Sequence, residues 1–121
     1  MINLQKRLLS FRYAFQGLKY LFKSQPNARI HLFALLLVHV FGIWLSCSFT
    51  EWAILWLCIG AVLAAEAFNT ALESLTDLVS PQRHELAGKT KDLAAAGVLL
   101  TAISAMVVSG LIFIPKLGQL L

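Results

Sequence analysis

Apolar residues fill three long stretches of the chain, at residues 30–49, 52–79 and 91–114. A helix of about 20 residues spans about 30 Å, which is the thickness of the hydrocarbon core of a bilayer. The second stretch is apolar only as far as residue 65, but its helical register continues through a set of polar residues. We therefore predict three transmembrane helices.

Prolines mark the ends of two of these stretches. Ser80-Pro81 follows the second stretch and Pro115 follows the third, so we expect each helix to stop there. The third stretch is rich in alanine, glycine and serine, and such small residues let helices pack closely in lipid. This composition predicts contact between helices rather than an isolated span.

A different pattern precedes the first span, over residues 4–23. Its large apolar residues recur every three or four positions and fall in a stripe roughly 80° wide on a helix, with lysines and arginines beside it. Such a basic amphipathic helix is typical of the membrane surface; packing against other helices is the alternative. The stripe consists of Leu4, Leu8, Phe11, Phe15, Leu18 and Phe22.

Composition supports a membrane protein built as one all-α domain. The 121 residues are 59% hydrophobic and only 13% charged, more apolar surface than a small soluble domain could bury. The chain start lacks the pattern of a cleavable signal peptide, so none is expected. Cys47 and Cys58 lack the CxxC spacing of redox or metal sites and are interpreted as small buried hydrophobic residues.

The distribution of basic residues predicts an orientation rather than a nucleic-acid partner. Six of the ten lysines and arginines precede residue 30, and three more lie in the loop at 80–92. The turn at 46–51 has none, and the C-terminal tail has only Lys116. Because cytoplasmic loops carry the excess of positive charge, we expect the N-terminus and the 80–92 loop inside and the C-terminus outside.

Four polar residues continue the second span, and they are the first candidates for chemistry. Glu66, Asn69, Glu73 and Asp77 occupy one arc of roughly 80° and rise about 16 Å along a helix. Burying a carboxylate near lipid costs kilocalories unless a cation, a proton or a partner compensates. Residues 30–49, 52–79 and 93–114 contain no lysine or arginine that could do so structurally, which favours a functional site.

Two histidines in the first span and the loop before the third span contain the other candidate polar residues. His31 and His39 interrupt the first span, and His39 is interpreted as a packed, hydrogen-bonded residue. Lys91-Asp92 stands where the third helix is expected to begin, a position that favours phosphate. The fragment 88–90, Gly-Lys-Thr, imitates a Walker A loop, but Arg83 occupies the position of its required glycine, which excludes a P-loop.

The stretch from Glu66 to Asp77, EAFNTALESLTD, resembles the signature E-x-x-N-[ST]-A-[IL]-E-x-x-x-D of the small prokaryotic diacylglycerol kinases and the related undecaprenol kinases. His84-Glu85-Leu86 and Lys91-Asp92 match the second block of that family at similar spacing. The resemblance covers nearly the whole chain. It implies a homotrimer in the bacterial inner membrane that transfers a phosphoryl group from MgATP to a lipid hydroxyl, at sites between subunits.

The resemblance also implies roles for individual residues. Glu66 would be the general base and Asn69 would position the lipid hydroxyl or a phosphate oxygen, with Arg29 beside the lipid. Glu73 would hold Mg²⁺. The residues that would bind ATP are Glu73, Asp77, His84, Gly88, Lys91 and Asp92.

One position departs from the family pattern. The family usually places a glutamate after the surface helix as a second metal ligand, and the aligned residue here is Gln25. Magnesium prefers hard oxygen ligands and keeps water readily, so an amide or a water could fill the position more weakly. The alternative is that Gln25 is only a cap or turn residue before Pro26.

Three other functions compete with a diacylglycerol kinase. An undecaprenol kinase would use the same chemistry, because both lipids present a primary hydroxyl at the membrane surface. A small ion or proton carrier would place charges near mid-membrane on several helices. A non-catalytic scaffold would not need Asn69 and Glu73 in register with Lys91-Asp92.

Overall fold

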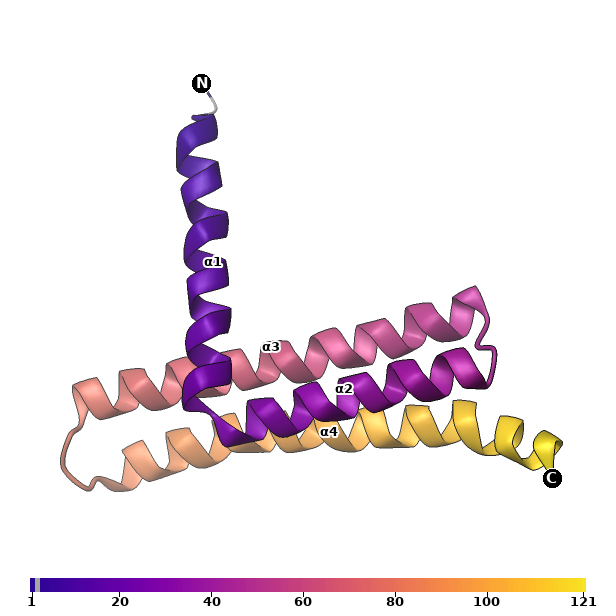
Figure 1. The fold of residues 1–121 in the computed structure, drawn as a ribbon. Helices are drawn as coiled ribbons and strands as arrows, with labels where there is room; N and C mark the ends of the chain where they lie inside the picture. The colour runs from indigo at the N-terminus through magenta and orange to yellow at the C-terminus, as the bar shows by residue number, and fades with distance from the viewer. Residues whose placement is uncertain (2) are drawn as a thin grey trace.

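The computed structural model describes residues 1 and 3–121, and every regular element in that part of the chain is a helix. Figure 1 shows three of the helices lying side by side, with the N-terminal helix set across them. The three have the length and apolar composition to cross a membrane, which confirms the predicted all-α membrane architecture. The elements are α1 Leu4–Ser24, α2 Pro26–Trp44, α3 Phe49–Val79 and α4 Glu85–Leu120.

The apolar stripe of α1 is left uncovered by the other helices over most of its length. Leu8, Phe11 and Phe15 are 61%, 66% and 69% exposed, and the one buried residue of the helix is Leu21, near its C-terminal end. A helix that packed on the bundle would bury this stripe. Its exposure, with the transverse setting of α1 in Figure 1, therefore favours the membrane-surface interpretation.

A single residue, Gln25, makes the corner between α1 and α2. Its backbone N–H donates to the Leu21 carbonyl at 2.9 Å, and its own carbonyl accepts from the Arg29 N–H at 3.4 Å. Pro26 is the first residue of α2, where a missing N–H costs no helical hydrogen bond. The helix therefore begins before the predicted residue 30. Ala28, fully buried, fixes the corner against the bundle.

α4 begins earlier than predicted because His84 caps it. The His84 side chain accepts a hydrogen bond from the Leu86 N–H at 3.1 Å, so the helix starts at Glu85 rather than at residue 91. Lys91 consequently lies more than a turn inside the helix. The expectation that Lys91 stands at an exposed helix N-terminus is therefore wrong.

The prediction that Pro115 ends the third span is wrong, because α4 continues through Pro115 to Leu120. Membrane helices tolerate proline where neighbouring groups satisfy the freed backbone. An ion pair holds the continuation against the bundle, with Lys116 Nζ 3.0 Å from Glu51 Oε2. Glu51 also forms a capping box with Ser48 at the start of α3.

The α2–α3 turn is stabilised by tight packing of aromatic rings. His39 lies 5.4 Å from Trp52 and 5.3 Å from Trp56 between ring centroids, and its Nδ1 lies 2.8 Å from the Leu35 carbonyl oxygen. His39 is therefore packed and hydrogen-bonded, as predicted. Cys47 and Cys58 are free thiols, but they are only half-buried.

Gly42 is the point of closest approach in this turn, and a substitution there tests the packing. A Cβ added at Gly42 would lie 2.5 Å from the Trp52 ring, whereas one at Gly60 would have no such neighbour within 4 Å. Overpacking typically costs about 1–3 kcal/mol. We expect Gly42→Ala to destabilise the protein in detergent unfolding titrations and Gly60→Ala not to do so. Equal stability of the two variants would contradict this packing.

Candidate functional site

The polar residues of α3 form a gradient from the buried bundle to solvent. Glu66 is only 2% exposed, Asn69 and Glu73 are half-buried, and the Asp77 side chain is 65% exposed. Figure 1 shows the C-terminal end of α3 and the start of α4 projecting past the level at which α1 joins α2. If α1 lies on the membrane surface, the row runs from the membrane edge into the aqueous phase.

The nearest charged or ionisable partner of Glu66 is a histidine on α2. His31 Nε2 lies 3.2 Å from Glu66 Oε1, although the two groups are not aligned as a hydrogen bond. No lysine or arginine among the described residues pairs with Glu66. An imidazole is therefore the ionisable group that the described chain places beside this buried carboxylate.

Three buried oxygens close together on α3 lack hydrogen-bond partners. They are Glu66 Oε1, Asn69 Oδ1 and Thr70 Oγ1. Leaving a buried polar group unsatisfied costs about 1–3 kcal/mol. Such a cluster within two helical turns is typical of a site that a ligand or solvent completes, and a hydroxyl-bearing substrate offers both a donor and an acceptor.

An apolar groove lies within the bundle beside this cluster. It has a volume of about 500 Å³, is lined almost entirely by apolar residues of α2, α3 and α4, and includes His31 in its lining. The same imidazole thus borders the groove and contacts Glu66. The groove offers a place for a hydrocarbon chain whose polar end would lie near Glu66.

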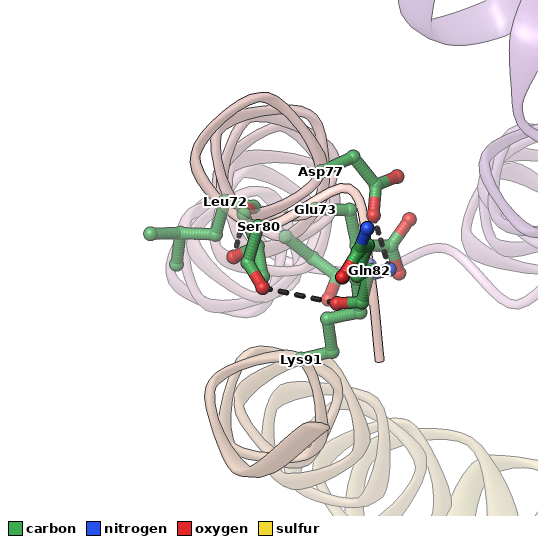
Figure 2. Close-up of polar contacts among 8 residues, drawn as sticks. Leu72, Glu73, Asp77, Ser80, Gln82 and Lys91 are labelled. Carbon is green, nitrogen blue, oxygen red and sulfur yellow. Dashed lines mark hydrogen bonds and ion pairs between the residues drawn. The ribbon is translucent and has the colours of Figure 1, made fainter. Parts of the chain in front are cut away.

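Glu73 and Asn69 form the next polar pair along α3. Asn69 Nδ2 donates to Glu73 Oε1 at 3.2 Å, and Figure 2 shows Glu73 on the side of α3 away from Leu72. This hydrogen bond leaves Glu73 Oε2 and Asn69 Oδ1 available to bind a metal ion. Both are hard oxygen donors of the kind that Mg²⁺ prefers.

The described residues offer no group of three or more acidic, histidine or cysteine side chains that could hold a metal. Gln25 lies half-buried at the α1–α2 corner, and Arg29 is exposed one turn into α2. No side-chain hydrogen bond in the described chain joins either residue to Asn69 or Glu73.

A lysine connects α4 to the outer end of the row. Lys91 Nζ donates to Asp77 Oδ1, and Figure 2 shows its side chain reaching from α4 toward α3. The Lys91 side chain is 41% exposed, so the pair is open to solvent and adds little stability. Its consequence is positional, because it holds an ammonium group beside the carboxylates of α3.

Beside this pair, the α3–α4 loop and the adjoining helix ends line an open pocket of about 530 Å³. Four of the residues predicted to bind ATP line it: Asp77, His84, Gly88 and Lys91. Arg83 adds a second cationic side chain to the lining. Glu73 and Asp92 do not line this pocket; Glu73 lies one turn nearer the membrane on α3, and Asp92 is exposed on α4.

His31 is one of the site residues that sequence reasoning missed, together with Thr70 and Arg83. The sequence showed His31 only as an interruption of the first span, and nothing in its spacing pointed to Glu66 on another helix. Its place close to the start of that span was the one usable signal. A residue there lies at the same end of the bundle as the polar extension of the second span.

The chain is similar in sequence to known proteins over most of its length. A family model described as prokaryotic diacylglycerol kinase matches residues 12–113. A diacylglycerol kinase of Synechocystis is 44% identical over 115 residues, which are 94% of this chain and 66% of the relative, just under two thirds of its length. An undecaprenol kinase of Bacillus subtilis is 34% identical over 115 residues, 95% of this chain and 94% of the relative. A diacylglycerol kinase of Escherichia coli is 30% identical over 95 residues, 78% of each chain.

Proposed function

This chain belongs to the prokaryotic diacylglycerol kinase family, and from that premise we propose that it transfers the γ-phosphoryl group of MgATP to the hydroxyl of diacylglycerol, giving phosphatidic acid. The observation that carries the proposal is Glu66, a carboxylate 2% exposed between an apolar groove and a row of polar groups. A lipid hydroxyl reaches such a carboxylate from the bilayer, while a nucleotide reaches the other end of the row from water.

Glu66 acts as the general base in this proposal. Its unpaired Oε1 accepts the proton of the lipid hydroxyl as the hydroxyl oxygen attacks the γ-phosphorus, and the bond from that phosphorus to the departing ADP oxygen breaks. Asn69 Oδ1, also unpaired, orients the hydroxyl or a phosphate-bound water. Burial excludes bulk water, which protects ATP from hydrolysis.

The loop pocket holds the nucleotide in the same proposal. Lys91 and Arg83 offer positive charge to phosphate oxygens, and Asp77 keeps the Lys91 ammonium in place. Glu73, with Asn69, would hold the Mg²⁺ of MgATP, which when bound neutralises phosphate charge. Gln25 forms the corner between α1 and α2, and this structural role does not depend on a contact between its amide and the metal.

Undecaprenol is the second candidate acceptor. The undecaprenol kinase of Bacillus subtilis aligns over 94% of its length, and a groove of about 500 Å³ could take a single hydrocarbon chain. An ion carrier fits less well, because five of the six acidic residues lie toward the α3–α4 loop, where Asp77 pairs with Lys91.

An assay of purified protein in lipid nanodiscs tests the function. Each disc contains dioleoylglycerol, undecaprenol or neither lipid, and transfer from radiolabelled ATP is followed with and without EDTA. We expect a labelled lipid product that forms fastest with dioleoylglycerol and disappears with EDTA. Faster labelling of undecaprenol would make it the acceptor, and no labelled lipid in any disc would overturn the kinase proposal.

We further propose that the protein is a homotrimer in the bacterial inner membrane, with α1 and the α3–α4 loop at the cytoplasmic face. Support comes from the family and from the broad exposure of α2, α3 and α4, whose membrane faces need lipid or other copies as neighbours. Native mass spectrometry from detergent should give a mass of three chains. A monomer alone would contradict the assembly.

Orientation is tested by reporter fusions. A reporter active only in the cytoplasm should give signal when inserted after Gln82 and none when fused to Leu121, because the basic residues gather at the α1 and loop end. Signal from the C-terminal fusion would contradict three spans with a cytoplasmic N-terminus.

The metal role of Glu73 predicts a change in magnesium dependence. Glu73→Gln replaces a charged oxygen ligand by a neutral one, so the half-saturating free magnesium should rise when it is measured at fixed MgATP. Glu51→Gln is the matched control, since Glu51 lies at the opposite end of α3. If Glu73→Gln leaves the magnesium dependence unchanged, Glu73 is not the ligand.

A further inference from the structure

The geometry around Glu66 points to a role for His31. We propose that His31 is a positioning residue of the lipid-kinase reaction, whose imidazole N–H holds the Glu66 carboxylate in place and aims it at the lipid hydroxyl. The inference rests on the function proposed above and adds a residue to it. The juxtaposition that carries it is His31 Nε2 at 3.2 Å from Glu66 Oε1, on two different helices.

The first argument is electrostatic. Burying a carboxylate costs free energy unless a nearby polar or ionisable group compensates. Glu66 is 2% exposed, and no lysine or arginine of the described chain pairs with it. Among the described residues, His31 supplies the ionisable side chain in contact with Glu66, so its imidazole is the group that can fix the carboxylate in position.

The second argument concerns direction. The present contact is short enough for a hydrogen bond but is not aligned as one. Catalytic hydrogen bonds are often misaligned without substrate and tighten when it binds. A carboxylate oxygen accepts two hydrogen bonds, so Glu66 Oε1 can take one from His31 and still receive the substrate hydroxyl.

The third argument concerns access. His31 is 22% exposed and lines the apolar groove, so it lies where a lipid chain would pass Glu66. His39 lies on the same helix but is not paired with Glu66 and does not line the groove. It packs between Trp52 and Trp56 and is bonded to Leu35 of its own helix. It therefore serves as the matched control.

Variant kinetics test the proposal. We expect His31→Leu to lower kcat roughly 10- to 100-fold with KM for MgATP unchanged, below the about 10²–10⁴-fold expected for loss of the base itself. His31→Gln keeps an N–H donor and should recover part of the rate, while His39→Gln should keep nearly all of it. Adding His31→Leu to Glu66→Gln should cause no further loss, because His31 acts through Glu66.

The positioning role, the contact and the kinase function would each be contradicted by a different result. Full kcat in His31→Leu, or losses that multiply in the double variant, would reject the positioning role. A readout independent of activity is the ¹⁵N chemical shift of the histidine rings, which should change at His31 and not at His39 upon Glu66→Gln. Unchanged His31 shifts would reject the contact itself. Wild-type protein that phosphorylates no lipid would instead overturn the kinase function, and with it the role of His31.

Discussion

The structure depends on keeping one carboxylate inside a membrane bundle. Glu66 is 2% exposed, and its Oε1 has an imidazole nearby but no aligned hydrogen bond. Such burial costs kilocalories that packing elsewhere must offset. The surrounding elements answer that constraint: α2 brings His31 beside Glu66, and α3 continues the polar row outward.

The two ends of the bundle have different designs. At the α2–α3 turn, aromatic packing around Gly42 and the Glu51–Lys116 ion pair fix the helices closely. At the opposite end, the α3–α4 loop leaves a pocket and exposed charges, and the unpaired oxygens lie between the two ends, on α3. A rigid end that supports an open, polar end suits a protein that must admit a nucleotide from water and a lipid from the bilayer.

Sequence reasoning succeeded where the signal lies within one helix. The apolar stretches predicted the three long helices, and the offsets of Glu66, Asn69 and Glu73 predicted their common face, because helical geometry fixes both. It failed at Pro115, since the Lys116–Glu51 pair that holds the last turns joins residues far apart in sequence.

The same limit applies to His31 and to the start of α4. His31 contacts Glu66 across two helices, and no spacing rule connects residues 31 and 66. The early start of α4 depends on a cap, and His84 is a less familiar capping residue than serine, threonine or aspartate. Family resemblance named the roles of the polar residues, but only the structure showed which of them are buried and unpaired.

The central claim is that buried Glu66 is the base that activates the lipid hydroxyl. The most direct test is the turnover of Glu66→Gln in nanodiscs, at saturating lipid and MgATP and in the wild-type oligomeric state. The account predicts a fall in kcat of at least about 100-fold with KM for MgATP unchanged, because the amide cannot take the proton. Wild-type turnover in this variant would contradict it.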